Sequence, residues 1–129
     1  MNVTRLTPNL YTDDVEACVK FWVERLHFEK TVEVPDGNGR VQFAALQKGK
    51  IEVMYGSYAS LEKDENVKGT FQRGTGFLFL EVDDLDAVVA AMKGVTMVAP
   101  VHKTFYGATE FTVKDPAGHL ITFAHFERK

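Results

Sequence analysis

Few side chains in this sequence are placed where they could do acid–base chemistry. Glu52 lies in the otherwise apolar run Ile51 to Tyr55, and Met54 falls on the same side of an alternating strand. A carboxylate on such an apolar face must be paired with a cation or have its pKa raised. Glu52 is therefore the candidate general base, or else the partner of a cationic ligand.

The histidines and the single cysteine offer less chemistry. Cys18 is the only cysteine, which excludes an intramolecular disulfide and a cysteine-based zinc site. His119 and His125 have the opposite strand parity to Thr122, so they should face away from it, and His102 has no fixed partner in the sequence. We interpret these three histidines as exposed or structural, with a rearranged metal site built from them as the alternative.

The pattern of the chain predicts the elements that position these residues. An alternating strand over Leu6 to Tyr11 precedes a helix that a capping box, Asp13 to Glu16, should open. That helix should bury Cys18 and Trp22 and end near His27. A second helix should start at Asp83-Asp84 and stop at Gly94. The other predicted strands are Phe28–Val34, Arg40–Gln47, Ile51–Tyr55, Gly76–Val82, Thr96–Thr104, Thr109–Lys114 and His119–Phe126.

These elements form an internal repeat. A shift of 70 positions places Leu10 to Ala17 on Leu80 to Ala87, and Ile51 on Ile121. The predicted fold class is α+β, with two βαβββ repeats forming a cupped mixed sheet. We expect a single domain over 1–129, with repeat one at about 5–56, a polar connector at about 57–74 and repeat two at about 75–126. The segment from Gly56 to Gly74 is read as a solvated connection, with a protein-contact surface as the alternative.

Three local motifs resemble the vicinal oxygen chelate superfamily, which includes glyoxalase I, extradiol dioxygenases and bleomycin-resistance proteins. They are Leu10 to Val15 with Phe21-Trp22 downstream, Phe79 to Leu85, and the turn Asp115-Pro116-Ala117-Gly118. The resemblance implies the glyoxalase-like fold and a homodimer. One departure is His27, which stands where the family usually has glycine and should need a left-handed backbone.

The resemblance also maps the family's metal ligands onto this chain. The four positions are Thr7, Glu52, Phe77 and Thr122, and the 70-residue shift gives the same pairs. Only Glu52 is a good ligand, since phenylalanine cannot coordinate and threonine hydroxyls bind transition metals poorly. We therefore expect no metal and no cofactor. In this respect the sequence is most similar to the metal-free bleomycin-resistance branch of the family.

Strand parity predicts an apolar, aromatic lining for the cup, which is typical of small-molecule sites. Phe105 and Tyr106 should lie in a loop over its mouth. The predicted ligand-binding residues are Thr7, Asn9, Tyr11, Glu52, Met54, Phe77, Phe79, Glu81, Phe105, Tyr106 and Thr122. The alternative is that aromatic side chains fill the cup and leave no cavity.

Charge and hydropathy indicate which classes of binding partner to expect. The net charge is −3, from 15 basic and 18 acidic residues, which disfavours nucleic acid. No run of 18 apolar residues is present, and Met1 to Arg5 lack an apolar signal core, so we expect no membrane contact and a cytoplasmic location. The leading hypothesis is a metal-free protein that sequesters a partly aromatic ligand. The negative net charge favours a ligand that is also cationic. The alternatives are a lyase or isomerase that uses Glu52 as base, and a dimeric module with a protein partner.

Overall fold

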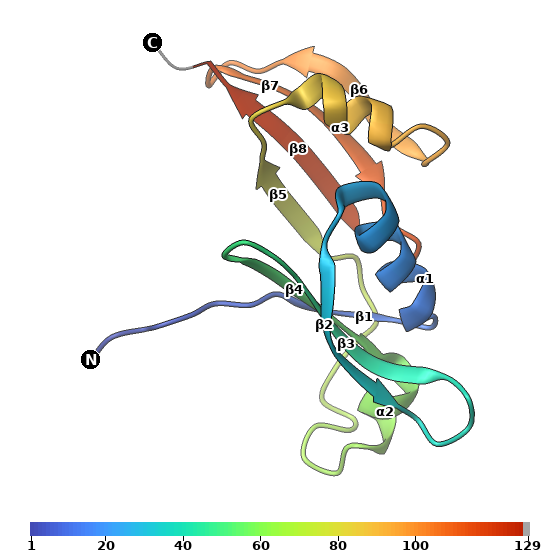
Figure 1. The fold of residues 1–129 in the computed structure, drawn as a ribbon. Coiled ribbons are helices and arrows are strands. Elements are labelled where there is room, and N and C mark those ends of the chain that lie inside the picture. The colour runs from blue at the N-terminus through green and yellow to red at the C-terminus, as the bar shows by residue number, and fades with distance from the viewer. Residues whose placement is uncertain (128–129) are drawn as a thin grey trace. The chain divides into compact units, whose positions relative to one another are not determined.

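The computed structural model describes residues 1–127, shown in Figure 1. The chain divides into two compact units, Met1–Arg73 and the part from Gly74 onward. Each unit contains one four-stranded mixed sheet with a helix packed against it. The α+β fold of two βαβββ modules is therefore confirmed.

The first unit carries the sheet order β1-β4-β3-β2. Its strands are β1 (Asn9–Thr12), β2 (Glu29–Pro35), β3 (Val41–Lys48) and β4 (Ile51–Ser57). Strands β1 and β4 run parallel, and the other neighbours are antiparallel. The first strand begins later than the sequence predicted: Leu6 is exposed and outside it. Pro8, which has no amide hydrogen, precedes the first ladder residue.

The first helix is shorter than predicted and changes character along its length. Helix α1 (Val15–Lys20) continues into the π-helical segment η1 (Phe21–Arg25). Its N-cap is Asp14, whose side chain accepts from the amide of Ala17, so the predicted capping box at Asp13 is wrong by one residue. The expected core role of Trp22 is confirmed, since it is buried and its indole donates to the Tyr55 hydroxyl at 2.8 Å.

His27 follows the helix with φ +60°, so the predicted left-handed backbone is confirmed. Only glycine adopts this region without steric cost, and a histidine side chain is strained there. His27 is the only non-glycine residue with positive φ among residues 1–127. The chain reversal into β2 therefore depends on a residue that tolerates the turn rather than favours it.

The segment expected to be a connector contains a helix. Helix α2 (Tyr58–Lys63) starts at Ser57, whose hydroxyl caps the amide of Ser60. The rings of Tyr58 and Phe71 stack at 6.5 Å, and the Arg73 guanidinium lies 4.1 Å from the Tyr58 ring centroid. The polar connection expected here therefore contains a short helix that was not predicted, and its aromatic residues fold the segment against itself.

The second unit repeats the topology of the first with the order β5-β8-β7-β6. Its elements are β5 (Phe77–Glu81), α3 (Leu85–Ala91), β6 (Met97–Lys103), β7 (Ala108–Lys114) and β8 (Leu120–Phe126). Asp84 caps α3 as Asp14 caps α1, and α3 packs against β8. On the helix side, the sheet buries Phe111, Val113, Ile121 and Phe123 completely.

The constant 70-residue shift fails in the last strand. Asn9 pairs with Met54, but Phe79 pairs with Thr122 rather than with Ala124, as the shift requires. The connections differ in length between the repeats: β3 and β4 join through Gly49-Lys50, whereas β7 and β8 join through 115–119. Strand register therefore matches Glu52 with Leu120, and the predicted equivalence of Glu52 with Thr122 is wrong.

Within residues 1–127, no helix is long and apolar enough to cross a membrane.

Candidate functional site

Glu52 is a paired carboxylate on the open, helix-free face of the first sheet. The Thr7 hydroxyl donates to its Oε1 at 2.9 Å, and Arg5 forms an ion pair with its Oε2 at 3.0 Å. Its side chain is 15% exposed. Of the two outcomes expected for an acid on this face, pairing is the one observed. The partner comes from this chain, so Glu52 does not need a cation from a ligand.

The other predicted residues of the first unit lie on the same face. Asn9 donates from its amide nitrogen to the Tyr11 hydroxyl at 3.3 Å, and Met54 is half-buried beside Asn9 in the ladder. The Tyr11 ring crosses over Gly56, where a Cβ would lie 2.8 Å from the ring carbon Cε1. Tyr11 also contacts the Tyr58 ring at 6.1 Å between centroids. The polar groups and rings of this face therefore interact with one another through hydrogen bonds and ring contacts.

The residues at the family's metal positions do not fit a metal. Phe77 has no donor atom, and both oxygens of the only good ligand, Glu52, already accept from Thr7 and Arg5. Thr122 is buried and shares a 2.7 Å hydrogen bond with Thr112. Among residues 1–127, no three side chains of histidine, cysteine, aspartate or glutamate form a group that could hold a metal ion. A transition metal needs such a group.

The open face of the second sheet is different, because it exposes large apolar rings. Phe77 is 64% exposed, Phe79 52%, Phe105 100% and Tyr106 45%. These rings form a series with Phe126: Phe79 lies 6.3 Å from Phe126, Phe126 6.1 Å from Tyr106, and Tyr106 5.2 Å from Phe105. We call Phe77, Phe79, Phe105, Tyr106 and Phe126 the aromatic face.

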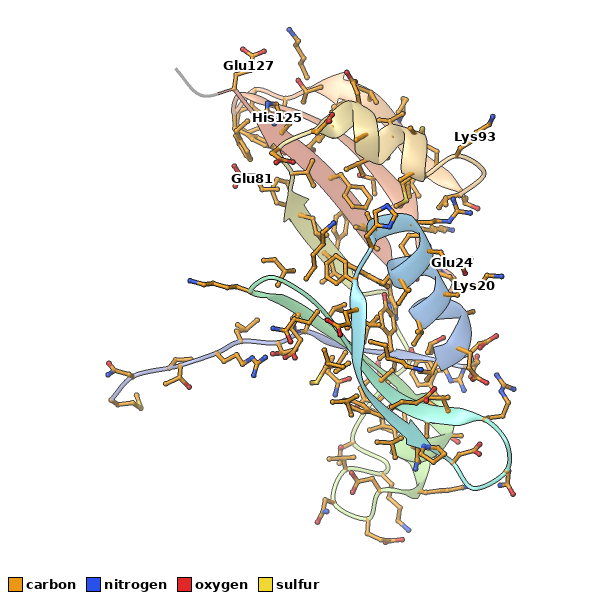
Figure 2. The ribbon with its side chains drawn as sticks, viewed as in Figure 1. Lys20, Glu24, Glu81, Lys93, His125 and Glu127 are labelled. Atoms are coloured by element: carbon orange, nitrogen blue, oxygen red, sulfur yellow. The ribbon has the colours of Figure 1, made fainter. Side chains whose placement is uncertain are left out.

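Small and hydroxyl-bearing side chains lie beneath these rings. Thr112, Thr122 and Ala124 belong to the same side of the sheet by register, and all three are buried. Phe79 is the ladder partner of Thr122, and Glu81 that of Ala124. Figure 2 shows Glu81 at the end of β5. The predicted residues Phe77, Phe79, Glu81, Tyr106 and Thr122 therefore belong to one unit, and Phe105 extends the series from its loop.

Glu110 is a buried acid that the sequence reasoning missed. It lies on β7 with the parity of Thr112, and its side chain is 11% exposed. The Tyr106 hydroxyl donates to its Oε2 at 2.6 Å. The carboxylate raises the pKa of the Tyr106 phenol, mainly through this hydrogen bond. A charged residue between Thr109 and Phe111 in a strand was the signal that could have found it.

His102 faces the other oxygen of Glu110. The two residues are direct ladder partners, and His102 Nε2 lies 3.8 Å from Glu110 Oε1. Its Nδ1 lies 2.7 Å from the Pro100 carbonyl oxygen. Because a carbonyl only accepts, Nδ1 carries the hydrogen, and Nε2 of the neutral ring presents a lone pair. His102 therefore has a partner that sequence alone did not show.

The two remaining histidines are structural, as expected. His119 is buried, and its Nδ1 accepts from the Gly76 amide at 2.7 Å. His125 lies on the side of β8 opposite Thr122, and its Nδ1 donates to the Val82 carbonyl at 2.9 Å. Both histidines tie strands of the second sheet to neighbouring backbone. Neither belongs to the aromatic face.

A groove in the first unit was not predicted. Its volume is about 570 Å³, and it lies between the first helix and strands β2 and β3. Its lining residues are Glu16, Val19, Lys20, Val23, Glu24, Phe28, Glu29, Lys30, Glu33 and Val41. Figure 2 shows Lys20 and Glu24 projecting from the helix, and they pair at 4.0 Å, as Lys30 and Glu33 do at 3.1 Å. Because these charged residues of the groove pair with each other, they are less available to a charged ligand than Glu110 is.

Comparison with protein families gives a match over nearly the whole chain. Residues 4–123 match the model of the Glyoxalase/Bleomycin resistance protein/Dioxygenase superfamily. The chain belongs to this superfamily. No curated protein sequence matches it significantly. Superfamily membership agrees with the two βαβββ modules, and it does not by itself assign a reaction.

Solved structures show the same fold at low sequence identity. TioX from Micromonospora sp. ML1 is 22% identical with a TM-score of 0.77, covering 97% of this chain and 100% of its own. Lactoylglutathione lyase from Agrobacterium tumefaciens is 17% identical with a TM-score of 0.78, covering 97% and 95%. A family enzyme from Burkholderia phytofirmans PsJN is 18% identical with a TM-score of 0.74, covering 94% and 97%. Identities this low carry the fold alone.

Proposed function

We propose that this superfamily member binds a partly aromatic small molecule by stacking it on the aromatic face of the second unit. The observation that carries the proposal is the exposure of Phe77 and Phe79 on one side of a single sheet, together with Phe105 in the loop before β7. Soluble domains seldom expose contiguous apolar patches without a binding role. Single exposed rings need no explanation, but four rings in series, with Phe77 on the same side of the sheet, do.

The geometry of the rings suits a flat ligand. Phe79, Phe126 and Tyr106 lie at centroid distances of 6.1–6.3 Å, close enough to form one continuous surface. Stacking a further ring on such a surface contributes about 0.5–1.5 kcal/mol beyond area burial. The buried Glu110 carboxylate beneath Tyr106 and the net charge of −3 favour a cationic ligand over an anionic one.

This function is that of a metal-free, bleomycin-resistance-type protein. It is supported by Phe77, which has no donor atom, and by Glu52, whose carboxylate is already occupied by Thr7 and Arg5. A homodimer is part of the proposal, since the resemblance implies one. The protein would then sequester its ligand without changing it.

An enzymatic function is the second candidate. A lyase or isomerase would use Glu52 as general base, but the structure gives this carboxylate two partners, Thr7 and Arg5. A base must have a free lone pair directed at the substrate proton. Glu52→Gln should abolish turnover of any substrate found, and a fully active variant would remove Glu52 from the mechanism.

The proposal is tested by titrating the protein with tryptophol, a neutral indole alcohol, and following amide shifts by NMR. We expect saturable binding with a Kd near or below about 1 mM, in line with the efficiency of small ligands. Phe79→Leu should weaken binding by about three- to tenfold. Phe71→Leu, which truncates a ring of the first unit, is the control and should leave binding unchanged. No saturable binding by tryptophol would overturn the proposal.

A further inference from the structure

We propose that His102 and Glu110 form a recognition site for an ammonium group of the ligand. This inference rests on the proposed function, because the pair lies beside Tyr106 of the aromatic face. It adds a chemical class to the ligand: an aromatic amine whose charged nitrogen is held at the edge of the stacked ring. The site is built from two acceptor atoms that no hydrogen of the protein occupies when His102 is neutral.

The first acceptor is fixed by a tautomer. His102 Nδ1 donates to the Pro100 carbonyl at 2.7 Å, so the lone pair of the neutral ring is on Nε2. That lone pair lies 3.8 Å from Glu110 Oε1, a distance beyond a hydrogen bond. Two acceptors at this spacing repel each other, and a donor cation placed against both removes the repulsion.

The second acceptor is Glu110 Oε1, because the Tyr106 phenol hydrogen-bonds to the other oxygen. The Tyr106 hydroxyl occupies Glu110 Oε2 at 2.6 Å, and the side chain of Glu110 is 11% exposed. Oε1 is left with no hydrogen-bond donor among residues 1–127. The raised pKa of Tyr106 fits this arrangement, since its main cause is the hydrogen bond to Glu110. An ionised, largely desolvated carboxylate binds a cation more strongly than an exposed one.

The charged groups around His102 and Glu110 can be identified from the strand register. On the same side of the sheet, the next residues in the row are Ala124 on β8 and the carboxylate of Glu81 on β5. Strand β6 is an edge strand, so no other described strand of this unit faces His102 from its far side. Lys103 has the opposite parity, and Lys114 lies at the far end of β7. The facing titratable groups are therefore Glu110, Tyr106 and, across Ala124, Glu81.

Protonation of His102 should compete with the ligand. The imidazolium would donate from Nε2 to Glu110, neutralising the carboxylate and repelling an ammonium group. An alkylammonium keeps its own proton across this range. Binding of the amine should therefore strengthen as His102 loses its proton, whereas binding of a neutral aromatic should not change.

The test compares tryptamine with tryptophol, which share the indole and differ in the ammonium and hydroxyl groups. At about pH 8 tryptamine should bind at least about tenfold more tightly than tryptophol, as expected for a charged hydrogen bond. At lower pH, where a proton on His102 would occupy Nε2, this preference should shrink. Glu110→Gln should abolish the preference, and His102→Gln should abolish its pH dependence. Glu29→Gln, which removes one charge from β2 of the first unit, is the control.

The outcomes separate the two proposals. Equal binding of the two indoles, with no effect of Glu110→Gln, would overturn the ammonium site and leave the aromatic face standing. Failure of both indoles to bind would overturn both proposals. A preference for tryptamine that the control variant also removes would show attraction by net charge alone and would overturn the site.

Discussion

The Tyr106 hydroxyl and the Glu110 carboxylate lie 2.6 Å apart and place a buried acid at the edge of an exposed aromatic surface. The two residues are four positions apart, one in the loop before β7 and one within it. The same contact raises the pKa of Tyr106. It therefore links a candidate site to a property that can be measured in the free protein.

The raised pKa predicts a loss of stability at alkaline pH. A phenol whose folded pKa exceeds its unfolded value of about 10 holds its proton more tightly when folded. Its stabilisation is complete below the unfolded pKa and is lost as pH rises through the folded pKa. The free energy of unfolding should therefore fall as pH rises above about 10, and less steeply in Tyr106→Phe.

Urea unfolding across this pH range measures the difference. Tyr58→Phe is the control, because the Tyr58 hydroxyl has no hydrogen bond to a carboxylate within residues 1–127, unlike that of Tyr106. Identical slopes for wild type and Tyr106→Phe would contradict the account of this pair.

Relief of backbone strain should stabilise the chain reversal after the first helix. His27 has φ +60° and an exposed side chain, so His27→Gly should raise the free energy of unfolding by about 0.5–1 kcal/mol. His27→Val should lower it, since a β-branched residue is poorer there. Urea denaturation checks both variants, and destabilisation by glycine would show that the histidine side chain stabilises the turn.

The buried hydrogen bond between Trp22 and Tyr55 should contribute to the stability of the first unit. Tyr55→Phe leaves the indole of Trp22 without its 2.8 Å acceptor and should cost about 1–3 kcal/mol. Trp22 is the only tryptophan, so its fluorescence reports unfolding of this unit directly. A cost below about 0.5 kcal/mol would mean that water or another group replaces the hydroxyl.

Gly56 is required by the ring that crosses it. A Cβ at this position would lie 2.8 Å from Tyr11 Cε1, so Gly56→Ala should destabilise the protein by about 1–3 kcal/mol. Tyr11→Leu should remove most of that penalty in the double variant. Thermal unfolding of the single and double variants tests this, and additive costs would mean that the clash is not with Tyr11.

Much of the fold followed from local patterns in the sequence. Alternation placed seven of the eight strands within two residues of their observed bounds. The left-handed backbone at His27 was expected from the resemblance, because the family usually has glycine there. Helix α2 was missed because it is only six residues long and lies in a largely polar segment. Its stabilising contacts, the stack of Tyr58 on Phe71 and the Arg73 cation, join residues up to 15 positions apart.

The site was only partly predictable for a related reason. Parity identified Phe79, Glu81 and Thr122 as one face, because alternation needs only the strand itself. It could not pair Glu110 with His102, since that pairing depends on the register between two strands, which bulges on β6 shift. The pairing of Glu52 with Arg5 was also hidden, because Arg5 lies outside any element.

The central claim is that the aromatic face of the second unit is the ligand site, and NMR mapping tests it most directly. Titration with tryptophol should shift the amides of Phe77, Phe79, Phe105, Tyr106 and Phe126 together, with one shared Kd. The amide chemical shifts of the groove residues Val19, Val23 and Val41 should not change. Shifts confined to the groove, or spread evenly over both units, would contradict the claim.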